Sequence, residues 1–122
     1  MKILLADDEE VVRIVGAEVL TSAGYDVVLA EDGQAAVEIF DRHLREWAMV
    51  VLDVAMPRLT GEQVFEHIHS RRPELPVALA SGYSSEEIDQ RFAGKAIAGF
   101  LHKPFPCDDL VDLVEEILGN RP

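Results

Sequence analysis

Short apolar runs alternate with amphipathic segments along this chain, five times in succession. The runs are Lys2–Ala6, Tyr25–Ala30, Ala48–Asp53, Pro76–Ser81 and Ala98–His102. Continuous apolar runs of this length predict strands that are buried on both faces, as in parallel sheets. Because a helical pattern follows each run, the sequence predicts an α/β domain in which five helices cover both faces of a five-stranded parallel sheet.

The predicted helices present apolar residues at helical spacing to this sheet. The inward residues should be Val12, Val15, Val19 and Leu20 in the first helix, Ala36, Val37, Phe40 and Leu44 in the second, Val64, Phe65 and Ile68 in the third, Ile88 and Phe92 in the fourth, and Leu110, Leu113, Val114 and Ile117 in the fifth, which runs from Asp108 to Leu118. On the first helix this arrangement leaves Val11 and Ile14 facing outward.

Length and charge narrow the classes of protein that fit this fold. A chain of 122 residues corresponds to one domain. The net charge of −12 leaves no basic face, so nucleic acids and anionic membranes are not expected as partners. Cys107 is the only cysteine, the N-terminus does not resemble a signal peptide, and no apolar run approaches ~18 residues. These features predict a cytoplasmic protein.

Polar residues gather where the predicted strands end. Asp7 and Asp8 follow the first strand, Asp53 ends the third, Ser81 ends the fourth and Lys103 follows the fifth. Because parallel strands bring their carboxyl ends to one edge of the sheet, these side chains should converge. Crowded carboxylates need a compensating cation, and Mg²⁺ prefers carboxylate, water and phosphate oxygens.

The remaining groups at this edge suit a phosphoryl group more than a metal ion. Lys103 supplies a positive charge and Ser81 a hydroxyl. An aspartate can act as a phosphoryl acceptor. The set therefore predicts phosphoryl transfer to one aspartate, assisted by Mg²⁺ or alternatively Mn²⁺.

Five short motifs resemble the receiver domains of two-component response regulators. The motifs are Ala6-Asp7-Asp8-Glu9, Leu52-Asp53-Val54-Ala55-Met56-Pro57, Gly61, Ala80-Ser81-Gly82-Tyr83 and Lys103-Pro104-Phe105. The resemblance spans essentially the whole chain, so residues 1–122 are expected to form one receiver domain. It implies a flavodoxin-like fold with strand order 2-1-3-4-5.

The resemblance also implies a role for each residue at this edge. Asp53 would take a phosphoryl group from the phosphohistidine of a histidine kinase or phosphotransfer protein. Mg²⁺ would be bound by Asp8 and Asp53 directly, by Asp7 through water, and by the carbonyl of Ala55. Lys103, before a cis bond to Pro104, would contact the phosphoryl oxygens. Ser81 would be the switch hydroxyl, Phe100 the aromatic residue that responds to it, and Gly82 would keep the approach to Asp53 open.

Two enzyme-like or carrier alternatives fit the residues less well. A phosphatase of the haloacid-dehalogenase type also uses a nucleophilic aspartate, but it needs a second aspartate two residues later, where this chain has Ala55. A flavin or nucleotide carrier needs a glycine-rich loop after the first strand, where this chain has Asp7 to Glu10. We therefore expect a signalling domain, not an enzyme, with only self-directed phosphotransfer and hydrolysis. Ala55 cannot orient an attacking water, so it should not assist hydrolysis.

The partner and the context of the domain remain open at this level. The motifs fit a stand-alone regulator or the receiver module of a hybrid histidine kinase. The outward residues Val11 and Ile14 are either ordinary exposed apolar residues or a docking face for the helical bundle that carries the donor histidine. The resemblance leaves open whether phosphorylation drives a homodimer through the fourth and fifth helices and the fifth strand.

Overall fold

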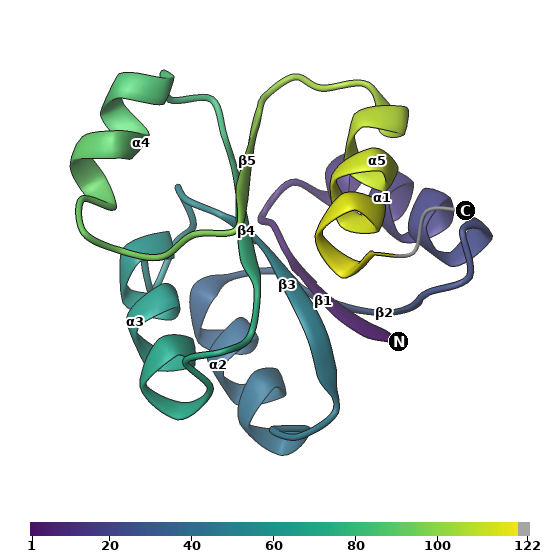
Figure 1. Cartoon of the computed structure of the whole chain (residues 1–122), viewed down its shortest axis with the longest axis horizontal. Coiled ribbons are helices and arrows are strands. Elements are labelled where there is room, and N and C mark those ends of the chain that lie inside the picture. The colour runs from purple at the N-terminus through teal and green to yellow at the C-terminus, as the bar shows by residue number, and fades with distance from the viewer. Residues whose placement is uncertain (120–122) are drawn as a thin grey trace.

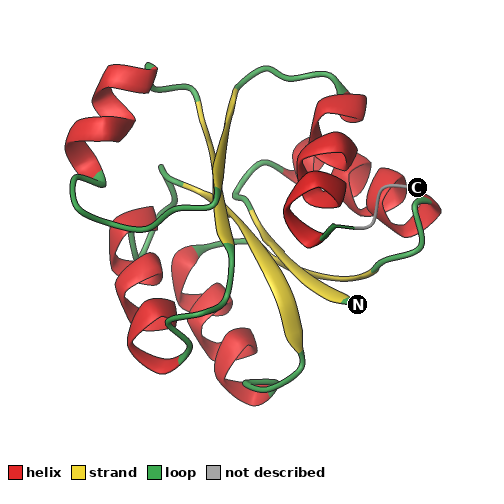
Figure 2. Cartoon of the chain, in the orientation of Figure 1, coloured by secondary structure: helices red, strands yellow, loops and turns green. Residues whose placement is uncertain are grey.

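One parallel sheet lies at the centre of the structure, with helices on both faces (Figure 1, Figure 2). The computed structural model describes residues 1–119; residues 120–122, the end of the predicted domain, lie outside the described residues. The strands are β1 (Lys2–Ala6), β2 (Asp26–Ala30), β3 (Trp47–Asp53), β4 (Val77–Ser81) and β5 (Gly99–His102), and the helices are α1 (Glu10–Ser22), α2 (Gly33–Arg42), α3 (Gly61–Arg71), α4 (Ser85–Arg91) and α5 (Cys107–Leu118). The strand order β2-β1-β3-β4-β5 confirms the predicted flavodoxin-like topology.

The central strand β3 explains why its sequence is apolar without alternation. Val50 and Leu52 pack into the core beneath α2, α3 and α4, whereas Met49 and Val51 pack into the core beneath α1 and α5. All four residues are buried because neither face of the strand meets water. In Figure 1 the two groups of helices lie on opposite sides of the sheet. The strand register aligns Asp53 with Ala80 of β4, so the carboxyl ends of these strands coincide.

Side-chain caps fix where three of the helices begin. Asp32 caps α2 by accepting a hydrogen bond from the Ala35 backbone N–H at 2.7 Å. Thr60 and Ser84 form capping boxes at the starts of α3 and α4, in which side chain and backbone bond reciprocally. Ser84 is thus the N-cap of α4. These caps satisfy N–H groups that would otherwise have no partner within the helix.

One predicted inward position, Val15, was wrong, and two predicted inward residues, Leu44 and Phe92, lie beyond the ends of their helices. Val15 on α1 is 37% exposed, and the residue that faces the sheet is Gly16, which is buried. A Cβ atom at Gly16 would lie 2.6 Å from Leu5 Cδ2, so the absence of a side chain lets α1 approach β1 closely. Leu44 is not on a helix, because α2 ends at Arg42, although Leu44 still packs half-buried against the core.

Other differences are confined to the ends of elements. Tyr25 is buried but precedes β2, and Trp47 extends β3 by one residue. Within the described chain, no helix combines the length and the apolar character needed to cross a membrane.

Candidate phosphoacceptor and metal site

The predicted site residues converge at the carboxyl edge of the sheet. Asp7 directly follows β1, Asp53 ends β3, Ser81 ends β4 and Lys103 follows β5. Three of these polar side chains are buried, with Asp7 and Ser81 1% exposed and Asp53 4% exposed, while Asp8 faces solvent. Burying a polar group costs free energy unless the group is paired. The burial of three such groups at one place therefore indicates a functional site.

Asp7, Asp8 and Asp53 form a carboxylate cluster. Each offers one oxygen, and these oxygens all lie within 4.8 Å of one another. Carboxylates this close repel, and a hard divalent cation with oxygen ligands would relieve that repulsion. The donor set therefore fits Mg²⁺.

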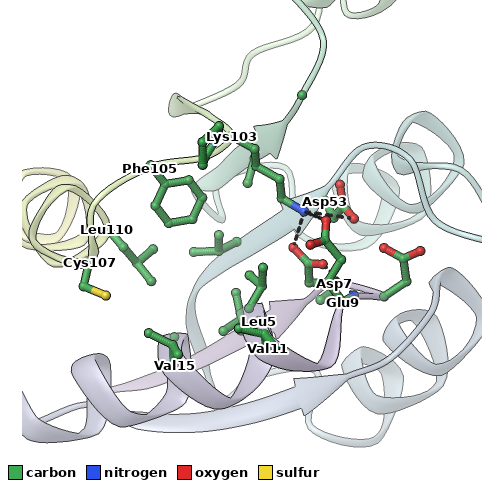
Figure 3. A pocket seen from close by; sticks show the side chains of 18 of the residues that line it. Leu5, Asp7, Glu9, Val11, Val15, Asp53, Lys103, Phe105, Cys107 and Leu110 are labelled. Atoms are coloured by element: carbon green, nitrogen blue, oxygen red, sulfur yellow. Dashed lines mark hydrogen bonds and ion pairs between the residues drawn. The ribbon is translucent and has the colours of Figure 1, made fainter.

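The ammonium group of Lys103 is directed into this cluster (Figure 3). Its Nζ lies 2.8 Å from Asp7 Oδ2, 3.2 Å from Glu9 Oε1 and 3.5 Å from Asp53 Oδ2. The Lys103 side chain is only 14% exposed and those of Asp7 and Asp53 are buried, so water screens these two pairs weakly. Lys103 therefore compensates part of the carboxylate charge.

Burial and charge shift the protonation of these groups. Burial raises the pKa of Asp53 to about 7, and the charge of Asp7 adds to the rise, while Lys103 opposes it. Burial alone would lower the pKa of Lys103, but its hydrogen bond to Asp7 and the charges of Asp53 and Asp7 outweigh that effect and raise it. Lys103 therefore stays charged. Asp53 binds a proton readily unless further positive charge, such as that of a metal ion, lies beside it.

Two residues of the site were missed in the sequence. Glu9 precedes α1 without capping it, and its carboxylate contacts Lys103 instead. The Nη1 of Arg13, one turn into α1, donates a hydrogen bond to the Asp7 carbonyl at 2.8 Å. Glu9 could have been predicted at the site from the sequence, because it belongs to the acidic run that follows β1. Arg13 gave no such signal, because its contact depends on the path of the chain between strand and helix.

The loop after Asp53 is held against the start of α3. The Ala55 backbone N–H donates to Asp53 Oδ1 at 3.4 Å, and the Gly61 N–H donates to the Val54 carbonyl at 2.8 Å. A Cβ at Gly61 would lie 2.6 Å from Val54 Cα, so only glycine permits this approach. The loop thus places Ala55, which has no polar side chain, two residues after Asp53.

Ser81 is held by backbone groups on both sides. Its Oγ accepts a hydrogen bond from the Tyr83 N–H at 2.9 Å, and its carbonyl accepts one from the Lys103 N–H at 2.8 Å. The Lys103–Pro104 peptide bond is cis, as expected. Phe100 on β5 is half-buried against the core beneath α2, α3 and α4, with its ring centroid 6.3 Å from that of His102. Ser81 and Phe100 thus lie on neighbouring strands.

A cleft of about 600 Å³ extends from the carboxylate cluster between α1 and α5. We call it the α1–α5 cleft; its lining includes Val11, Val12, Val15, Phe105, Cys107 and Leu110 as well as Gly82 and Ala55 near Asp53 (Figure 3). The outward orientation predicted for Val11 and Ile14 is confirmed, with 71% and 54% of each residue exposed. Val11 lines the cleft, while Ile14 lies one turn further along α1.

Comparison with known proteins agrees with this geometry. The sequence profile of the response regulator receiver domain matches residues 3–115. The chain is 34% identical over 119 residues to the sensor kinase CckA of Brucella abortus, covering 98% of this chain and 13% of that protein. It is also 34% identical over 115 residues to the transcriptional regulatory protein PdtaR of Mycobacterium tuberculosis, covering 93% of this chain and 55% of that protein. The chain thus spans about half or less of the length of these relatives.

Solved structures repeat the whole fold. The chemotaxis protein CheY4 of Vibrio cholerae superposes with a TM-score of 0.87 at 27% identity, covering 96% of this chain and 98% of that one. The response regulator TrrA of Thermotoga maritima, solved in complex with Mg²⁺ and a beryllium fluoride, superposes with a TM-score of 0.83 at 29% identity and the same coverage. These comparisons support neither the phosphatase nor the carrier alternative. The profile match, the strand order and the carboxylate cluster together show that the chain belongs to the response regulator receiver domain family of two-component signalling.

Proposed function

We propose that Asp53 accepts a phosphoryl group from a phosphohistidine on a histidine kinase or phosphotransfer protein. A carboxylate oxygen of Asp53 attacks the phosphorus, the phosphorus–nitrogen bond breaks, and the freed imidazole nitrogen takes up a proton. The observation that carries the proposal is the convergence of Lys103 with the carboxylates of Asp7 and Asp53, because this combination is expected where a phosphate is held beside a cation.

The residues around Asp53 would hold two groups, the metal ion and the phosphoryl group. Asp7, Asp8, Asp53 and the Ala55 carbonyl would hold Mg²⁺, which when bound supplies positive charge to the transferring phosphoryl oxygens. Lys103 would shift from Asp7 toward the phosphoryl oxygens. Mn²⁺ takes similar oxygen ligands and could occupy the same site.

The switch would begin at Ser81. Its hydroxyl would turn from the Tyr83 N–H to donate a hydrogen bond to the phosphoryl group on Asp53. Phe100, on the neighbouring strand, would then repack. Ser81 and Phe100 thus convert a local charge change into a change of surface, the usual logic of such switches.

The donor would dock over α1. Val11 and Ile14 are exposed apolar residues of α1, and Val11 also lines the α1–α5 cleft, which continues toward Phe105. A helical bundle that presents its histidine to Asp53 would cover them. The net charge of −12 argues against nucleic acid or an anionic membrane in this role.

We further propose that residues 1–122 act as one receiver unit in the cytoplasm. The domain would be a signalling module whose phosphotransfer and hydrolysis act on itself, either alone or within a longer protein. A homodimer formed on phosphorylation would use α4, β5 and α5. Sedimentation with and without a phosphoryl mimic measures that step.

Beryllofluoride, which mimics a phosphoryl group on aspartate, tests the proposal. TrrA was solved with Mg²⁺ and such a mimic, and we expect this chain to bind the same pair. The amide resonances of Ser81 and Phe100 should shift on binding, and Asp53→Asn should abolish the response. Asp89→Asn, an exposed change on α4, is the matched control. Binding that survives Asp53→Asn, or no binding at all, would overturn the proposal.

A further inference from the structure

Tyr83 joins the switch hydroxyl to helix α4. Its backbone N–H donates to Ser81 Oγ at 2.9 Å, and its ring lies under the guanidinium of Arg91, 4.2 Å from ring centroid to Cζ. Arginine over an aromatic face is an attractive contact. Arg91 therefore fixes the ring of the residue whose backbone holds Ser81.

Arg91 is in turn tied to helix α3. Its Nη1 lies 3.2 Å from Glu62 Oε2, at the start of that helix. The other oxygen of Glu62 is buried without a hydrogen-bond partner in the described chain, so Arg91 is an important compensation for this carboxylate. Gly61, the residue before Glu62, is bonded to Val54, which follows Asp53. These contacts thus connect the loop after Asp53 to the loop after Ser81 through helices α3 and α4.

The chain contains a natural control for this arrangement. Lys95, four residues beyond Arg91 in the loop after α4, forms an ion pair with Glu66, which lies one turn along α3 from Glu62. Both pairs attach the chain at or just after the end of α4 to α3, and both are partly exposed. Of the two cations, Arg91 is the one over the Tyr83 ring. Effects due to the ring contact can therefore be separated from effects of a surface ion pair.

We propose that Arg91 is a positioning residue that holds the β4–α4 loop (residues 82–84), through Tyr83, in the arrangement in which Ser81 bonds to its own loop. This inference rests on the proposed function, in which Ser81 must leave that arrangement to reach the phosphoryl group. Interactions made in one state but not the other set the balance between the states. Removing the Arg91 contact should therefore favour the switched state.

Beryllofluoride titration in the presence of Mg²⁺ measures this balance. Arg91→Ala should bind the mimic about three- to tenfold more tightly than the unaltered chain. Lys95→Ala should change binding less than twofold, and Arg91→Lys, which keeps the charge without the flat stacking group, should fall between. An Arg91→Ala affinity equal to that of Lys95→Ala, or weaker than that of the unaltered chain, would overturn the inference.

A double-mutant cycle tests whether the effect passes through the ring. In a Tyr83→Phe background, which keeps the aromatic face, Arg91→Ala should still tighten binding. In a Tyr83→Ala background it should have no further effect, and an undiminished effect there would contradict the route through Tyr83. Urea unfolding of each variant checks that the fold is intact. If the unaltered chain itself fails to bind the mimic, the proposed function fails; if it binds and Arg91→Ala binds no more tightly, only this inference fails.

Discussion

Lys103 Nζ lies closer to Asp7 Oδ2, at 2.8 Å, than to Asp53 Oδ2, at 3.5 Å. The lysine is thus paired more closely with Asp7 than with Asp53, the proposed phosphoacceptor. Its positive charge compensates the same carboxylates that a bound divalent cation would neutralise. Lysine and metal therefore compete for the same negative charge.

This competition predicts opposite effects of Lys103→Ala on stability and on metal binding. Without metal, the free energy of unfolding should fall by about 1–3 kcal/mol, because buried carboxylates lose their partner. Mg²⁺ should bind about tenfold more tightly, because a competing charge has gone. Trp47 fluorescence during urea unfolding, with and without Mg²⁺, measures both quantities, and Lys95→Ala is the control. A variant that binds Mg²⁺ more weakly would contradict the competition.

The raised pKa of Asp53 predicts a pH-dependent effect of Asp53→Asn. The pKa is about 7 in the metal-free fold against an ordinary value of 3.8, so the folded state binds this proton more tightly than the unfolded state. The stabilisation that comes from this tighter proton binding is complete below the pKa of Asp53 in the unfolded state. It is lost as the pH rises through the pKa of the folded state. Asp53→Asn should therefore be more stable than the unaltered chain at pH 8, on the order of a few kcal/mol, and the gap should shrink toward pH 5. Urea unfolding in metal-free buffer from pH 5 to 8 checks this; a gap that is independent of pH would refute it.

Ala55→Asn should speed the loss of phosphate from Asp53. An asparagine two residues after the nucleophile can orient a water by hydrogen bonding, which alanine cannot, and we expect acceleration of about tenfold. The decay of the phosphorylated chain, followed by phosphate-affinity electrophoresis, gives the rate. Ala55→Leu controls for size. Unchanged decay in Ala55→Asn would show that position 55 does not govern hydrolysis.

Ile14→Asp should slow phosphotransfer from a protein donor at least about tenfold while leaving beryllofluoride binding unaltered. Ile14 is 54% exposed on α1, and a charge there would oppose docking of an apolar partner surface. Thr21→Asp places the same charge at an exposed position near the far end of α1 and serves as control. Equal transfer rates for the two variants would remove α1 from the docking surface.

The strand ends were predictable because one physical rule fixes them. Once the runs ending at Ala6 and Asp53 are assigned to parallel strands, Asp7 and Asp53 must meet at one edge of the sheet. Lys103 and Ser81 follow by the same reasoning. The polar residues were thus located by topology, and the motifs supplied their expected roles.

Other features depended on contacts that sequence spacing does not encode. Gly16 adds nothing to a hydrophobic stripe, so the pattern put Val15 inward, whereas close packing on Leu5 selected the glycine. The Arg91–Glu62 pair joins residues 29 apart and depends on how α3 and α4 lie beside each other. Glu9 was visible as one more acid, but only the placement of Lys103 after β5, at the same edge of the sheet, brings the two together.

Direct phosphorylation of Asp53 tests the central claim most plainly. Phosphoramidate carries the same phosphorus–nitrogen bond as phosphohistidine and needs no partner protein, so it isolates the chemistry of this chain. In the presence of Mg²⁺, peptide mass spectrometry should find a single phosphoryl group on the peptide that contains Asp53. Transfer should disappear in Asp53→Asn and on removal of Mg²⁺. A phosphoryl group at another residue, or transfer at the same rate to Asp53→Asn, would contradict the assignment of Asp53 as the phosphoacceptor.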